Sequence, residues 1–140
     1  MKLDDIISEL QDLDDREKLE FLVEFSNQLP PLSPERAALE HPQDCRVQEC
    51  QTAVYLWVEV KEGRVQLEAD VPRQSPTVRG LVALLVEGLN GEPADAVLEL
   101  PEDLLPELGL VEALGMQRRQ GLGGVIRRIQ RDVRAAGSRN

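Results

Sequence analysis

The sequence is poor in histidine, cysteine and aromatic residues. Its 140 positions hold one histidine, His41, two cysteines, Cys45 and Cys50, and 3% aromatic residues. Two cysteines are too few for a disulfide framework or a four-ligand zinc site, and a single histidine excludes a histidine-rich metal site. We therefore expect no resident metal, and a core built from leucine, valine, isoleucine and alanine.

Long apolar runs are also missing. The longest, from Leu81 to Val86, falls far short of the about 20 residues that a membrane-spanning helix needs. The first 15 residues are acidic and lack an apolar core, so we expect no secretory signal and a cytoplasmic protein with reduced thiols. Neither a glycine-rich phosphate loop nor a G-x-S-x-G motif occurs, and we expect no cofactor.

Positive charge is scarce over most of the chain. The net charge of −10 argues against a nucleic-acid partner, because phosphate binding needs a basic surface. Residues 1–117 hold 9 Lys/Arg and 25 Asp/Glu, net −16, whereas residues 118–140 hold 7 Arg and one acid, Asp132, net +6. The basic end is either a solvated helix face that balances an acidic body or a docking surface.

The pattern of hydrophobic residues predicts helices, then a hairpin, then helices, which indicates an α+β fold. The length fits a single domain over residues 1–140. Helices are predicted over 3–13, from Asp14 to before Pro30, over 35–39, between Ser75 and Asn90, and over 119–136. Strands are predicted over 52–60 and 64–70, with a short strand or turn over 96–100.

Two of these elements carry specific signals. Asp14 and Glu17 form a capping box at the start of the second helix, whose inward face is predicted to hold Leu19, Leu22, Val23 and Ser26. The two central strands are joined by a short turn in which Gly63 is free to take positive φ. In the second strand, alternation places Val65, Leu67 and Ala69 inward.

Cys50 is the most informative position for chemistry. It lies at the end of a polar loop, residues 40–51, directly before a predicted strand. A thiol on a loop carried by a rigid scaffold suits group transfer. The reacting form is the thiolate, and a free thiol has a pKa near about 8.5, so a positive or hydrogen-bonding neighbour is expected. The alternative is that Cys50 is packed as a small hydrophobic residue.

Three other features leave alternatives open. Cys45 is a second thiol for Cys50, a metal ligand, or an incidental loop residue. His41 is a base for Cys50, oriented by Asp44 or Glu49, or a solvent-facing side chain. A glycine cluster near the last helix forms either an anion-binding nest or a surface for close helix packing, and it comprises Gly121, Gly123 and Gly124.

Three segments together resemble the SufE family of cysteine desulfuration proteins. Residues 46–56, RVQECQTAVYL, resemble the family's active-site pattern R-V-x-G/E-C-Q-S/T-x-V-W/F. Residues 76–82, PTVRGLV, resemble its V-x-G-L helix, and residues 118–126, RRQGLGGVI, resemble its R-S-N/Q-G-L-x-x-M-I segment. Leu29-Pro30 also fits, so the resemblance covers about residues 10–135 in the right order.

The resemblance implies a compact α+β domain with a small antiparallel sheet, of about three strands, flanked by helices. It also implies a function. Cys50 would accept persulfide sulfur from a pyridoxal-phosphate-dependent cysteine desulfurase of the SufS type, which is thereby stimulated. The sulfur would then pass to an iron–sulfur scaffold complex. The chain would act as a carrier rather than an enzyme and would bind no pyridoxal phosphate itself.

The resemblance also suggests supporting residues. Arg118 falls on the family's arginine near the cysteine pocket and is expected to support Cys50 by charge or hydrogen bonding, unless it pairs with an acid of the body. Asp70 falls on an acidic position at the end of the second strand. Glu49 stands where many members have glycine, and a carboxylate there disfavours the thiolate. The runner-up functions are an adaptor module with a structural Cys50 and a cysteine-dependent hydrolase.

Overall fold

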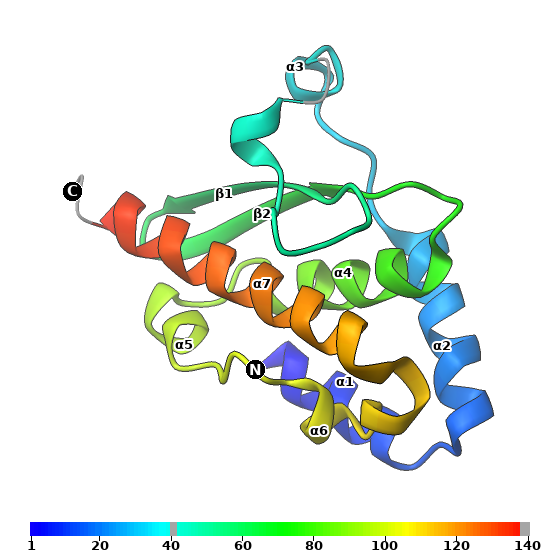
Figure 1. The fold of residues 1–140 in the computed structure, drawn as a ribbon. Helices are drawn as coiled ribbons and strands as arrows, with labels where there is room; N and C mark the ends of the chain where they lie inside the picture. The colour runs from blue at the N-terminus through cyan, green and yellow to red at the C-terminus, as the bar shows by residue number, and fades with distance from the viewer. Residues whose placement is uncertain (40–41, 138–140) are drawn as a thin grey trace.

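The computed structural model describes residues 1–39 and 42–137, and Figure 1 shows the expected order of helices, hairpin and helices. His41, considered above as a base for Cys50, lies outside the described residues. Every helix in the described part is too short or too polar to span a membrane. The elements are α1 (Lys2–Gln11), α2 (Asp15–Gln28), α3 (Pro34–Ala37), the 3-10 turn η1 (Gln43–Cys45), β1 (Tyr55–Lys61), β2 (Arg64–Asp70), α4 (Pro76–Leu89), α5 (Ala94–Leu98), α6 (Leu105–Leu108) and α7 (Val111–Gly137).

The sheet is an antiparallel hairpin of β1 and β2, in which Tyr55 pairs with Asp70 and Lys61 with Arg64. Its two-residue turn places Glu62 and Gly63 at positive φ, 54° and 76°, as a tight hairpin turn requires. Alternation along β2 buries the predicted residues Val65, Leu67 and Ala69. The α+β fold with a small antiparallel sheet is therefore as expected.

The expected third strand is wrong, because residues 94–98 form the helix α5. Pro93 precedes this helix, and an isolated bridge from Pro93 to Arg64 is its pairing with the hairpin. Val97 is fully buried, and the buried side chain of Gln130 donates to the carbonyl of Leu100 at 2.8 Å and to those of Val97 and Leu98. The carbonyl groups at the C-terminal end of α5 thus accept hydrogen bonds from α7 instead of from a neighbouring strand.

Helix α4 is the centre of the core. It lies against α1, α2, α7 and β2, and nine of its 14 residues are buried. A Cβ at Gly80 would lie 2.1 Å from the carbonyl oxygen of Leu22, and one at Gly88 would lie 2.9 Å from Leu3. Glycine at these two positions therefore lets α2 and α1 approach α4 closely.

Helix α2 begins as predicted but faces the core differently. Asp14 accepts from the amide of Glu17 at 2.8 Å, and Glu17 accepts from the amide of Asp14, so the capping box is confirmed. Lys18 is buried in place of two expected residues, because its stem packs inward while its amine donates to the carbonyl of Gly109 at 3.3 Å. The inward face keeps Leu22 and Ser26, whereas the exposed large side chains are Leu19 and Val23.

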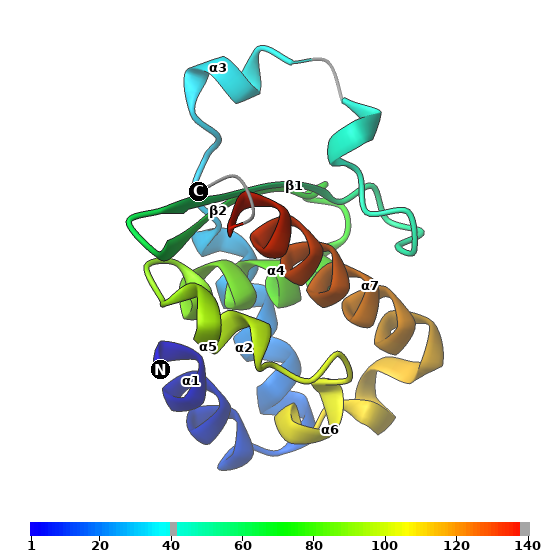
Figure 2. The ribbon, with the colours of Figure 1, turned by 90° about the vertical axis from the view of Figure 1, so that its left-hand side faces the viewer.

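Helix α7 crosses the hairpin on the side that also faces α4 (Figure 1). Gly115, with φ 81°, breaks it, so the regular helix starts after that residue, earlier than the predicted residue 119. The predicted inward residues are all buried: Leu122, Val125, Ile126, Ile129 and Val133. Figure 2 shows α3 and η1 on the opposite side of the hairpin, so the chain passes around the sheet before it reaches Cys50.

Candidate functional site

Cys50 lies in a loop that extends the hairpin. An isolated bridge between Arg46 and Tyr55 and a 2.9 Å hydrogen bond from the amide of Val47 to the carbonyl of Val54 close the base of this loop. Val47 and Val54 are buried, which fixes the base in the core. This explains why β1 starts at Tyr55 and not at residue 52 as predicted. We call residues 46–54 the cysteine loop.

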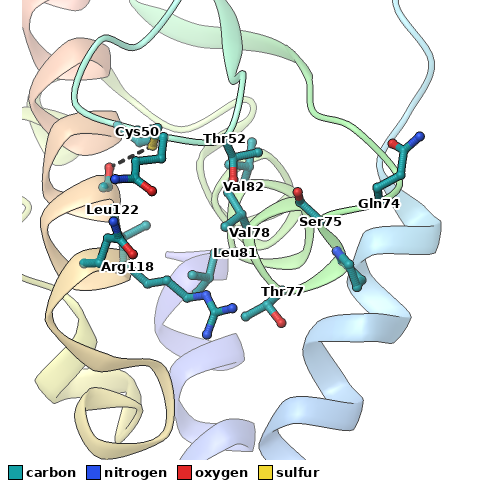
Figure 3. A pocket seen from close by; sticks show the side chains of 15 residues that line it. Cys50, Thr52, Gln74, Ser75, Thr77, Val78, Leu81, Val82, Arg118 and Leu122 are labelled. Carbon is teal, nitrogen blue, oxygen red and sulfur yellow. Dashed lines mark hydrogen bonds between the residues drawn. The ribbon is translucent and has the colours of Figure 1, made fainter.

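The cysteine loop rests on α7 where that helix has glycines. The thiol of Cys50 donates to the carbonyl of Gly121 with an Sγ–O distance of 3.4 Å (Figure 3). A Cβ at Gly121 would lie 3.2 Å from this sulfur, and a Cβ at Gly124 would lie 2.5 Å from Cβ of Glu49. The lack of a side chain at these two glycines therefore lets the cysteine loop, rather than another helix, approach α7 closely.

Arginines of α7 hold the cysteine loop in place. Arg128 donates to the carbonyl of Arg46 at 3.0 Å and to that of Asp44, and it pairs with Asp132 at 3.0 Å. Arg127 lies 3.4 Å from the carboxylate of Glu49. The sequence does not predict these roles of individual arginines, for which its only signals are an acid beside Cys50 and a basic helix elsewhere.

A pocket of about 320 Å³ lies between the cysteine loop, the start of α4 and α7. Its lining combines apolar residues of α4 and α7 with polar residues, among them Ser75, Thr77 and Gln117. Figure 3 shows Cys50 at one side, while Arg118 extends from α7 toward the start of α4. The apolar lining comprises Val78, Leu81, Val82, Leu122 and Val125.

The structure brings Cys50 and Arg118 to this one pocket and places Asp70 elsewhere. Arg118 is exposed, and no hydrogen bond or ion pair joins it to another described residue. Asp70 lines a separate hollow with Tyr55 and Trp57, beneath the segment that carries α3. Asp70 does not line the pocket that holds Cys50. Its role in the chemistry of Cys50 stays a prediction.

Arg119, the neighbour of Arg118, has a different role. Its Nε donates to both carboxylate oxygens of Asp103, at 2.8 and 3.0 Å. This hydrogen bonding holds the pKa of Asp103 below its ordinary value. Of the two adjacent arginines, Arg119 forms a structural ion pair and Arg118 lines the pocket.

The resting thiol of Cys50 is protonated. Burial, followed by the carboxylate of Glu49, raises its pKa from 9.0 to about 11, while the cation of Arg46 acts in the opposite direction. At pH 7 such a pKa leaves about one thiolate in 10,000 molecules. Burial also raises the pKa of Cys45, which is half-buried in η1. Burial and the Glu49 carboxylate therefore both disfavour the thiolate of Cys50 in this conformation.

Metal coordination finds no support in the described part of the chain. Within residues 1–39 and 42–137, no group of three or more His, Cys, Asp and Glu side chains is placed to hold a metal ion. Cys45 and Cys50 are both free thiols. Of these two thiols, Cys50 lines the pocket and Cys45 does not.

Comparison with known proteins places the chain in a family. The family model described as "SufE: Fe-S metabolism associated domain" matches residues 4–133. The chain belongs to the SufE family. The resemblance seen in three sequence segments is thereby confirmed. The family is associated with Fe–S metabolism, and a role in sulfur transfer is consistent with this association.

Individual SufE-family relatives agree over most of their length. An uncharacterized SufE-like protein of Mycobacterium tuberculosis (strain H37Rv) is 35% identical over 137 residues, covering 96% of this chain and 92% of the relative. One from Synechocystis is 30% identical over 117 residues, covering 84% and 70%. A hypothetical protein of Thermus thermophilus, solved in solution, matches with a TM-score of 0.84 and 34% identity over 98% of this chain and 96% of its own.

Proposed function

We propose that this protein is a sulfur carrier that accepts persulfide sulfur on Cys50. The donor is a pyridoxal-phosphate-dependent cysteine desulfurase of the SufS type, which the carrier stimulates, and the recipient is an iron–sulfur scaffold complex. One observation carries the proposal: in a SufE-family chain, a loop cysteine lies at the edge of a pocket that it shares with Arg118. The chain is a relay rather than a complete enzyme.

The transfer needs a thiolate and a sulfur–sulfur bond. The Cys50 thiol loses its proton to solvent or to a group of the partner, and the thiolate attacks the terminal sulfur of the desulfurase persulfide. A new bond forms from Cys50 Sγ to that sulfur, the old sulfur–sulfur bond breaks, and its electron pair stays on the desulfurase cysteine. Cys50 becomes the persulfide, no external oxidant or reductant is consumed, and the desulfurase is free for another turnover.

The cysteine loop suits this step because its tip can move while its base stays. Gln48, Glu49 and Gln51 are exposed, whereas Val47 and Val54 remain buried at the base. In the closed position Cys50 is 7% exposed, which shields a bound persulfide from water and small thiols. In the open position the thiol gains solvent, and its pKa falls toward the ordinary value.

Arg118 supports the anionic forms in this proposal. The attacking thiolate and the product persulfide both carry negative charge, which a cation within about 4–6 Å favours. Arg118 lines the pocket without an ion-pair partner in the described residues, so its charge is available. Burial, Glu49 and Arg46 set the resting pKa of Cys50. The charge of Arg118 therefore stabilises the persulfide and the thiolate of the docked state rather than the resting thiol.

The proposed compartment is the cytoplasm. Both cysteines are free thiols, which suits a reducing environment. The net charge of −10 favours a protein partner over nucleic acid. The desulfurase and the scaffold are the partners that this relay requires.

Stimulation of a desulfurase tests the proposal. Cys50→Ser should abolish the stimulation of sulfide release or alanine formation from cysteine. Cys45→Ser is the matched control, because it removes the other thiol five residues away, and it should keep most of the stimulation. Equal loss in both variants would indicate a two-thiol mechanism and would refute the assignment to Cys50 alone.

An adaptor function is the second candidate, because the burial of Cys50 in the core is also what a structural cysteine would show. An adaptor would stimulate its partner by contact alone. Full stimulation by Cys50→Ser would therefore favour the adaptor over the carrier.

A further inference from the structure

The tip of the cysteine loop is tied to α7 by one ion pair. Oε2 of Glu49 lies 3.4 Å from Nη2 of Arg127, and the two side chains are 44% and 45% exposed. Arg127 also lies 3.6 Å from Glu102 through its other terminal nitrogen, Nη1. Since Glu49 directly precedes Cys50, this pair connects the residue beside the thiol to the helix.

The helix surface beneath this pair is made of glycine backbone. A Cβ at Gly124 would lie 2.5 Å from Cβ of Glu49 and 3.0 Å from its Cγ and Cδ, so the stem of Glu49 lies directly on the helix. A Cβ at Gly123 would lie 3.4 Å from Nη1 of Arg127. A side chain at Gly124 would displace Glu49 from this position.

We infer that the Glu49–Arg127 pair, seated on Gly124, is a latch that keeps the cysteine loop closed, and that release of Glu49 accompanies sulfur uptake. That the loop opens for sulfur uptake rests on the proposed function. Arg128 holds the stem of the loop separately, through the carbonyls of Asp44 and Arg46, so the latch acts on the tip.

The geometry also indicates which group leaves. Arg127 keeps Glu102 beside it when the loop opens, whereas Glu49 loses its cation. An exposed ion pair contributes little free energy, so a docking protein can open it at small cost. The released carboxylate of Glu49 is then available to a basic group of the partner.

Cys50 alkylation without any desulfurase tests the latch, in a Cys45→Ser background so that one thiol reacts. Arg127→Gln should raise the alkylation rate about two- to fivefold. The direction is diagnostic, because removal of a cation near a thiol disfavours the thiolate and would by itself slow the reaction. Arg131→Gln is the matched control: it removes one arginine from the same helix, where Arg131 pairs with Asp132, and should leave the rate unchanged.

Gly124→Ala and hydrogen exchange provide independent tests. The added methyl group should displace Glu49 and speed alkylation in the same direction, while alanine favours the helix over glycine, so α7 should stay folded. Backbone amides of residues 48–52 should exchange faster in both variants.

Two results together would overturn the latch. The alkylation rates of Arg127→Gln and Gly124→Ala would be no higher than that of Arg131→Gln, and amide exchange at residues 48–52 would be unchanged. Because no desulfurase or sulfur is present, this result is independent of whether Cys50 carries sulfur. Failure of the sulfur-transfer proposal would instead show in the desulfurase assay with Cys50→Ser.

Discussion

Helix α4 and the cysteine loop lie side by side at the pocket, but different forces hold them. Nine of the 14 residues of α4 are buried, and its position is set by apolar contacts with four neighbouring elements. In the cysteine loop, Val47, Cys50 and Val54 are buried, and the remaining attachment is polar, through Arg127 and Arg128. The scaffold is therefore held by apolar burial, whereas the cysteine loop combines three buried residues with polar ties to α7.

The largest effect is expected from a cavity in α4. Leu84 is fully buried, so Leu84→Ala should lower the free energy of unfolding by about 2–5 kcal/mol. Leu19→Ala is the control, since Leu19 is 37% exposed and its truncation should cost less than about 1 kcal/mol. Urea denaturation measures both. Similar losses in the two variants would contradict the central position of α4.

The second prediction concerns pH. The folded state raises the pKa of Cys50 from 9.0 to about 11, so it holds this proton more tightly than the unfolded state. The resulting stabilisation is fully present below pH 9 and is lost as pH rises through about 11, in total about 2–3 kcal/mol.

Cys50→Ser isolates this contribution, because serine does not titrate in that range while all other groups are shared. Denaturation of both proteins between pH 8 and pH 11.5, about the range of the shift, should show a steeper loss in the unsubstituted chain. Parallel stability profiles would mean that the thiol is not shielded in the resting loop.

The third prediction separates the stem of the loop from its tip. Arg128 is 14% exposed and donates to two loop carbonyls, so Arg128→Ala should cost about 1–3 kcal/mol and loosen residues 44–46. Arg131→Ala, one turn along the helix, should cost less than about 1 kcal/mol. Hydrogen exchange and urea denaturation provide the readouts, and equal costs would show that Arg128 is not an anchor.

The smallest change in stability is expected at Arg118. This side chain is exposed and unpaired within the described residues, so Arg118→Ala should alter unfolding by less than about 0.5 kcal/mol. Sulfur uptake should nevertheless slow by about fivefold, because the loss of a cation near the persulfide costs about 1 kcal/mol. A loss of stability without slower uptake would instead indicate a structural ion pair.

Local signals in the sequence predicted the elements that local chemistry determines. The capping box of Asp14 and Glu17, the turn at Gly63 and the alternation along β2 all occur as expected. The short apolar pattern of residues 96–100 fits a strand or a helix equally, and the contact that decides between them, from Gln130, comes from a distant helix. Lys18 is likewise buried in place of Leu19 because of a contact with a distant residue, the carbonyl of Gly109.

The site was predictable only in part for a similar reason. Cys50 stands in a recognisable motif, and Arg118 in a second motif indeed lines the same pocket. The ties from Arg127 and Arg128 to the cysteine loop depend on how α7 crosses the hairpin, which no local pattern encodes. Gly121 and Gly124 stand close together in the sequence, but only the fold shows that Cys50 and Glu49 pack on them.

Sulfur uptake on Cys50 can be read from the intact mass of the protein. The protein is incubated with a cysteine desulfurase and cysteine, separated from small molecules and weighed. We expect a gain of one sulfur atom, located on the peptide that contains Cys50, retained in Cys45→Ser and absent in Cys50→Ser. An unchanged mass in the unsubstituted protein, or the same gain in Cys50→Ser, would contradict it.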